Sequence, residues 1–151
     1  FPFQWRSLLK PELKHFGIGA CCSIALWAVA HIGNYLVLSK SDKLGTEIEG
    51  IYSLKQEVSP LVGLALICFV GLGEEIQRSA ITLSFGASYG HYIGMILSAF
   101  LFAVEVSIIV KYNVAILAAF IFGLAWSALF LRTKSVFASF TCHVVWDLLL
   151  L

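Results

Sequence analysis

The stretch LVGLALICFVGLGEEIQRSA, residues 61–80, starts as an apolar run and ends with two glutamates and an arginine. Either a helix reaches water at this point, or a charged site lies inside a membrane. An ionised side chain near the centre of a bilayer is costly, and by default it is a sign of function. The rest of the chain decides between a hydrophobic anchor and a bundle built around a buried site.

The composition indicates a membrane protein. Of the 151 residues, 60% are hydrophobic and 13% are charged, whereas soluble domains carry about 25% charged residues. A soluble core of this size cannot hide so much apolar surface, so we expect an all-α, multi-pass bundle whose first partner is the lipid bilayer. The net charge of +1 gives no case for nucleic-acid binding. All four cysteines lie in apolar runs without CxxC spacing, which is typical of packing residues.

Five stretches are long and apolar enough to form spanning helices of about 20 residues. They cover about 15–38, 60–85, 89–110, 114–131 and 135 to the end, with a turn at FGASYG, residues 85–90. The predicted organisation is a basic lead over 1–14, a first helix over 15–38, an exposed polar loop over 39–59 and a four-helix core over 60–151.

Basic residues that flank the helices predict the orientation, because they favour the cytoplasmic side. Two basic groups would share one side of a five-span bundle, which places the amino terminus in the cytoplasm; they are Arg6, Lys10 and Lys14, and Arg132 with Lys134. Three lysines in the opposing polar segment reduce this bias.

Small residues recur every four positions in two of the predicted helices. The first series is Gly90, Gly94 and Ser98, and the second is Ala115, Ala119, Gly123 and Ser127. Small residues at this spacing let helix backbones approach closely in lipid. The two series together favour a compact bundle over independent anchors.

Ionisable residues lie where the helices should be inside the membrane; they are Glu74, Glu75, Arg78, Glu105, His143 and Asp147. Glu74 and Arg78 are i,i+4 and can pair, and His143 and Asp147 have the same spacing. With His143 neutral, four carboxylates and one arginine carry −3 when all are ionised. Because a dry site cannot hold that charge, some carboxylates are protonated, water enters, or a cation binds.

The pattern resembles the CPBP family, the type II CAAX prenyl-protease and bacteriocin-processing intramembrane proteases. That family shows EExxxR, then FxxxH, then HxxxN or HxxxD. Here the corresponding text is GEEIQR at 73–78, ILSAFLFAVE at 96–105 and GLAWSALFLRTKSVFASFTCHVVWD at 123–147. The resemblance covers roughly residues 60–151.

The resemblance implies a helical membrane bundle that cleaves a peptide bond with a glutamate-activated water. Glu74 would match the water-activating glutamate, and Glu75 and Arg78 its neighbours. His143 and Asp147 would match the pair that binds the scissile carbonyl and its oxyanion. The chemistry is sensible in itself, because a carboxylate can take a proton from water and return it to the leaving amine.

Two departures bear on activity. EEIQR has one residue fewer between Glu and Arg than the family pattern, which turns Arg78 by about 100° on a regular helix. The second-motif histidine is absent, because the position four residues after Phe102 is Val106, and the nearest polar group is Glu105.

Three functions therefore stay open. The first is an intramembrane endopeptidase with a modified site, acting on a peptide or membrane-protein substrate. The second is a relative that has lost catalysis and serves as a scaffold or partner subunit of a larger complex. The third is a divalent-metal or proton site; its ligands would be Glu74, Glu105 and His143, although the Glu-x-x-His spacing of di-iron bundles is missing. No cofactor beyond such a metal is indicated.

Overall fold

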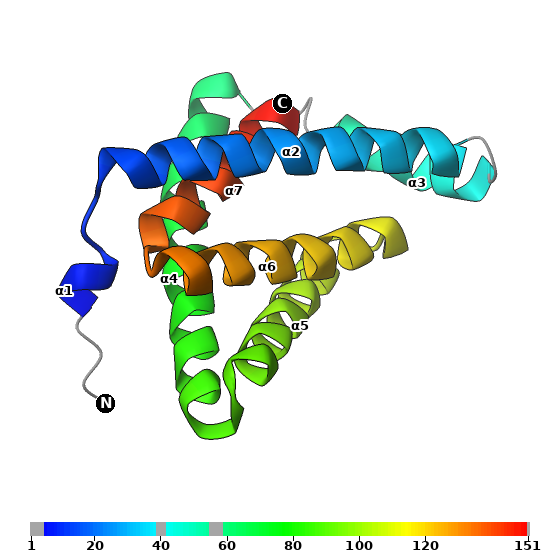
Figure 1. Ribbon diagram of the computed structural model, residues 1–151. Coiled ribbons are helices and arrows are strands. Elements are labelled where there is room, and N and C mark those ends of the chain that lie inside the picture. The colour runs from blue at the N-terminus through cyan, green and yellow to red at the C-terminus, as the bar shows by residue number, and fades with distance from the viewer. Residues whose placement is uncertain (1–4, 39–41, 55–58, 151) are drawn as a thin grey trace.

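The computed structural model describes residues 5–38, 42–54 and 59–150, and within these ranges every regular element is an α-helix (Figure 1). The expected all-α class is thus confirmed. The helices are α1 (Trp5–Leu8), α2 (Leu13–Leu38), α3 (Asp42–Leu54), α4 (Pro60–Tyr89), α5 (His91–Ile109), α6 (Asn113–Thr133) and α7 (Val136–Leu150). The five expected spans correspond to α2 and α4–α7.

The helix ends follow local backbone chemistry. Pro60 occupies the first turn of α4, where its missing N–H costs no hydrogen bond. The turn expected over 85–90 is wrong in extent, because α4 continues to Tyr89 and only Gly90 breaks the helix, with φ of 97°. Gly86 stays helical because it packs against Gly94 of the next helix. Lys134 separates α6 from α7 in a left-handed conformation, and its N–H donates to the Phe130 carbonyl.

The polar segment 39–59 is not a loop throughout, since α3 occupies Asp42–Leu54; residues 39–41 and 55–58 lie outside the described part. The missed signal is helical spacing, with Leu44 and Ile48 one turn apart and Ile48 buried. Glu47 accepts the backbone N–H of Val114 at 3.1 Å, which joins α3 to the first turn of α6. The basic lead likewise contains the short helix α1.

The close helix contacts depend on small residues. In Figure 1, α2 lies across α7, while α5 turns back from the end of α4 and then meets α6. A Cβ on Gly94 would clash with the Thr82 carbonyl of α4, and one on Gly123 would lie 3.1 Å from Ala99 Cα of α5. Gly19 of α2 has the same relation to the Ala138 carbonyl of α7. The spacing series therefore corresponds to real contacts, except that Gly90 lies in the turn.

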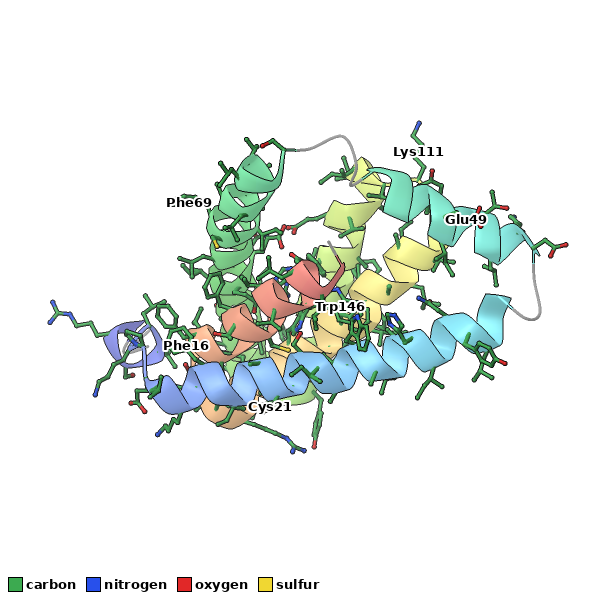
Figure 2. All side chains as sticks on the ribbon, turned by 90° about the horizontal axis from the view of Figure 1, so that it is seen from above. Phe16, Cys21, Glu49, Phe69, Lys111 and Trp146 are labelled. Carbon is green, nitrogen blue, oxygen red and sulfur yellow. The ribbon has the colours of Figure 1, made fainter. Side chains whose placement is uncertain are left out.

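The chain is an integral membrane protein. Among the described residues, three helices are long and apolar enough to cross a membrane, namely Leu13–Leu36, His91–Ile109 and Asn113–Thr133. α7 is a shorter apolar helix, and α4 is long enough but carries the Glu–Glu–Arg group. Large apolar side chains point outward from the bundle, as Figure 2 shows for Phe69 of α4. The Phe69 side chain is 81% exposed. Such a surface suits lipid and not water.

Two apolar clusters hold the helices together. One joins α4, α6 and α7 through Leu83, Phe130 and Val136. The other gathers Trp126 of α6 with Cys142 and Trp146 of α7, and residues of α2 pack against it. Figure 2 shows Trp146 inside the bundle, between α7 and its neighbours. The ionisable residues lie beside this second cluster, because Trp126 stacks on His143.

Candidate active site

Glu75 and Arg78 form a buried ion pair at the centre of the bundle. Their side chains are 1% and 3% exposed, and Arg78 Nη1 donates to Glu75 Oε1. The expected pairing of Glu74 with Arg78 is therefore not the contact that forms. Arg78 pairs with Glu75, three residues before it, because Glu75 points into the protein, where both charges are shielded from lipid. Glu74 instead lies at the side of a cavity.

His143 of α7 connects the two glutamates of α4. Its Nδ1 lies 2.9 Å from Glu75 Oε1, and with the ionised carboxylate as acceptor the Nδ1–H donates. Its Nε2 lies 3.6 Å from Glu74 Oε2 and 3.6 Å from Asp147 Oδ2. The imidazole is 6% exposed and thus contacts three carboxylates. The i,i+4 spacing in α7 and the close packing of α4 on α7 produce this arrangement.

Aromatic rings fix the Arg78 and His143 side chains. The Arg78 guanidinium lies 4.4 Å from the ring centroid of Phe102 and 4.9 Å from that of Trp126. Trp126 also stacks on the His143 imidazole, with centroids 4.0 Å apart and planes 20° apart. Ser98 of α5 donates to the Arg78 carbonyl at 3.1 Å, which fixes the backbone as well. Cations held against aromatic faces are stabilised by the ring quadrupole.

Glu105 does not join this network directly, but it borders the same site. Its Oε1 accepts the side-chain N–H of Gln77 at 2.6 Å, which links α5 to α4. Both residues line a small cavity between these helices, together with Glu74, Arg78, Ser98 and Phe102. The cavity volume is about 10 Å³, close to the room that one water molecule needs.

Gln77 is the residue of this site that the sequence analysis missed. Two signals pointed to it, because a Gln inside a spanning helix is itself unusual and it lies three residues after Glu74, on the same face. The structure thus brings Glu74, Glu75, Arg78, His143 and Asp147 into one network, and it places Glu105 at the cavity through Gln77.

The chain matches the model of one known protein family. The model of the type II CAAX prenyl endopeptidase Rce1-like family matches residues 56–149, which contain the whole of α4, α5 and α6 and nearly all of α7. The chain belongs to this family. Neither the curated proteins nor the solved structures searched contain a match. The expected relation to the CAAX proteases is confirmed, while α1–α3 lie outside the matched region.

The donor set bears on the metal alternative. Among the residues that the structure describes, no group of three or more His, Cys, Asp or Glu side chains is arranged to hold a metal ion. Glu105 is separated from the His143 cluster by its bond to Gln77, so the three suggested ligands do not converge as one set.

Proposed function

We propose that this family member is an intramembrane endopeptidase in which Glu74 activates a water molecule to cleave a peptide bond. The observation that carries the proposal is the small cavity beside Glu74, which has room for about one water and is walled by the cationic Arg78. Of the two adjacent glutamates on α4, Glu74 lines this cavity and keeps partial access, with 31% of its side chain exposed, while Glu75 is sealed.

The chemistry needs one carboxylate and balances without a cofactor. Glu74 takes a proton from water, and the hydroxide oxygen bonds to the carbonyl carbon of the substrate. The electron pair of the C=O bond moves to oxygen and forms a tetrahedral oxyanion. When this collapses, the C–N bond breaks and the amine leaves with the proton from Glu74. The products are a carboxylic acid and an amine.

Glu75 and His143 act as positioning groups in this proposal. The Arg78–Glu75–His143 chain of contacts holds the imidazole next to Glu74, at 3.6 Å. Trp126 fixes the plane of that imidazole. Glu74 is thus held in one orientation toward the cavity, and preorganisation of this kind is worth a large part of an enzyme's rate enhancement.

The family description indicates the substrate class to test first, a prenylated peptide with a carboxyl-terminal CAAX box. A second candidate function is that of a relative which has kept the fold and lost the ability to cleave peptides. The observation in its favour is that Val106 occupies the position of the second-motif histidine. Such a protein would act as a scaffold or subunit in a membrane complex.

The deciding experiment compares Glu74→Gln with Glu49→Gln, an exposed glutamate on α3. Both proteins are purified, placed in liposomes and given a farnesylated CAAX peptide, and mass spectrometry measures the released tripeptide. We expect Glu74→Gln to lose about 10²–10⁴-fold in rate and Glu49→Gln to cleave like the unmodified chain. No tripeptide from the unmodified chain, or equal rates for both variants, would favour the scaffold.

We also infer that the amino terminus lies in the cytoplasm, supported by the basic residues before α2 and after α6. A reporter fused to the amino terminus, active only in the cytoplasm, measures this directly. Activity of a reporter specific for the opposite compartment would contradict the inference.

A further inference from the structure

Arg78 has hydrogen-bond donors that the described residues do not use. Its Nη1 donates to Glu75, but its Nε and Nη2 are buried and have no hydrogen-bond partner in the described part of the chain. An arginine carries five N–H donors, and a buried donor without an acceptor is costly. An unpaired donor in a native interior therefore calls for an explanation, and a catalytic role is one of the known ones.

The unused donors belong to a side chain that cannot turn away. Phe102 and Trp126 lie against the guanidinium, Glu75 holds Nη1, and Ser98 holds the backbone carbonyl of Arg78. Arg78 lines the same cavity as Glu74. A rigid guanidinium that borders a water-sized cavity and keeps unused N–H donors has the character of an oxyanion hole, where donors are oriented before charge develops.

His143 and Asp147, which the family resemblance assigns to the carbonyl oxygen, are less suited in this chain. His143 Nδ1 is engaged by Glu75, and its Nε2 lies between Glu74 and Asp147, at 3.6 Å from each. Once Glu74 has taken the proton from water, an oxyanion placed there would still meet the Asp147 carboxylate at short range, and like charges at such distances repel strongly in a low-dielectric site.

We propose that Arg78, through its Nε–H and Nη2–H, binds the carbonyl oxygen of the scissile bond and stabilises the oxyanion that forms when hydroxide adds to the carbon. This rests on the proposed endopeptidase function and adds a catalytic residue to it. The water lies between Glu74 and the substrate carbon, and the negative charge that leaves the C=O bond is received by the guanidinium. A planar two-donor fork suits an oxygen anion, and a lysine cannot reproduce it.

The first test separates charge from geometry. Arg78→Lys keeps the cation that pairs with Glu75 but removes the two-donor fork, and Arg132→Lys, at an exposed position near the end of α6, is the matched control. The substrate is the farnesylated CAAX peptide, and the inhibitor is its phosphinic analogue, in which a tetrahedral anion replaces the scissile amide. We expect Arg78→Lys to lower kcat by about 10²–10³-fold with little change in KM. The affinity for the phosphinic analogue should fall by a similar factor.

The second test needs no variant of Arg78. The chain has only three arginines, so Nε–H signals of ¹⁵N-arginine-labelled protein in micelles are few. Arg6→Lys and Arg132→Lys, both at exposed positions, assign two of them and leave the third to Arg78. Adding the phosphinic analogue to the unmodified chain should shift the Arg78 signal and leave those of Arg6 and Arg132 in place.

The outcomes distinguish the two proposals. Loss of kcat with full affinity for the analogue would overturn the oxyanion role and leave Arg78 as the partner of Glu75 alone. A larger loss of analogue affinity in His143→Gln than in Arg78→Lys would overturn it as well. If the unmodified chain cleaves nothing, the endopeptidase proposal fails, and the NMR titration still decides whether Arg78 binds a tetrahedral anion; an unmoved Arg78 signal refutes that.

Discussion

Glu74 and Glu75 are neighbours, but the structure predicts opposite consequences for their loss. Glu75 is 1% exposed and is the carboxylate that pairs with the equally buried Arg78. Glu75→Gln keeps the shape and removes the charge, which leaves an uncompensated cation in the interior. Breaking a buried pair in this way costs about 3–5 kcal/mol. Glu74 keeps 31% exposure and makes no contact shorter than 3.6 Å with His143, so Glu74→Gln should cost less than about 1 kcal/mol.

The assay is reversible unfolding in mixed micelles, followed by circular dichroism, with peptide cleavage measured on the same preparations. Glu75→Gln should unfold far more readily, and Glu75→Leu combined with Arg78→Met should recover most of the stability, because an apolar pair of similar volume is often neutral or better. Glu74→Gln should unfold like the unmodified chain and cleave about 10²–10⁴-fold more slowly. Equal stabilities of the two single variants would refute this division of roles.

Three further predictions concern contacts between helices. Gln77→Leu should lower the stability by removing the bond to Glu105, and the exchanged pair Gln77→Glu with Glu105→Gln should restore it. The exchanged pair should not restore the cleavage rate, because the carboxylate is then no longer on α5. Recovery of both stability and rate would mean that the bond is purely structural. Gly94→Val should destabilise the fold by about 1–3 kcal/mol or more, measured against Gly17→Val, where a Cβ meets nothing within 4 Å; matching losses would contradict the close contact. Glu47→Ala should cost about 1 kcal/mol by removing the acceptor at the first turn of α6, and an unchanged unfolding midpoint would argue against that cap.

Most of the fold could be predicted because a helix that crosses a lipid bilayer has to meet only two simple requirements. A span needs length and low polarity, so the spans of α2, α5 and α6 can be identified from residue type alone. The amphipathic α3 was missed because its mixed charges dominate the composition of residues 39–59, and its buried Ile48 is visible only as helical spacing. The end of α4 is not predicted correctly because FGASYG, residues 85–90, has the composition of a turn, whereas Gly86 serves helix packing.

The site was only partly predictable. Intramembrane charge and i,i+4 spacing indicate which residues matter, but they do not decide between neighbours that differ by 100° around a helix. Arg78 could reach Glu74 or Glu75 by spacing, and it is the packing of α5, α6 and α7 around α4 that selects Glu75. The bond from Gln77 to Glu105 joins residues 28 apart in sequence, so no local pattern specifies it.

The two departures from the family pattern are best understood as one change. The family spacing would put the arginine at position 79, where Ser79 now lies buried with a hydroxyl that has no hydrogen-bond partner among the described residues. One residue earlier, Arg78 lies against Phe102, the first residue of the second motif, and it borders the cavity beside Glu74. The shortened motif thus places its cation against the helix in which the second-motif histidine is missing. If Arg78 binds the oxyanion, restoring either feature alone, by Val106→His or by moving the arginine to position 79, should not raise the cleavage rate, whereas restoring both together should.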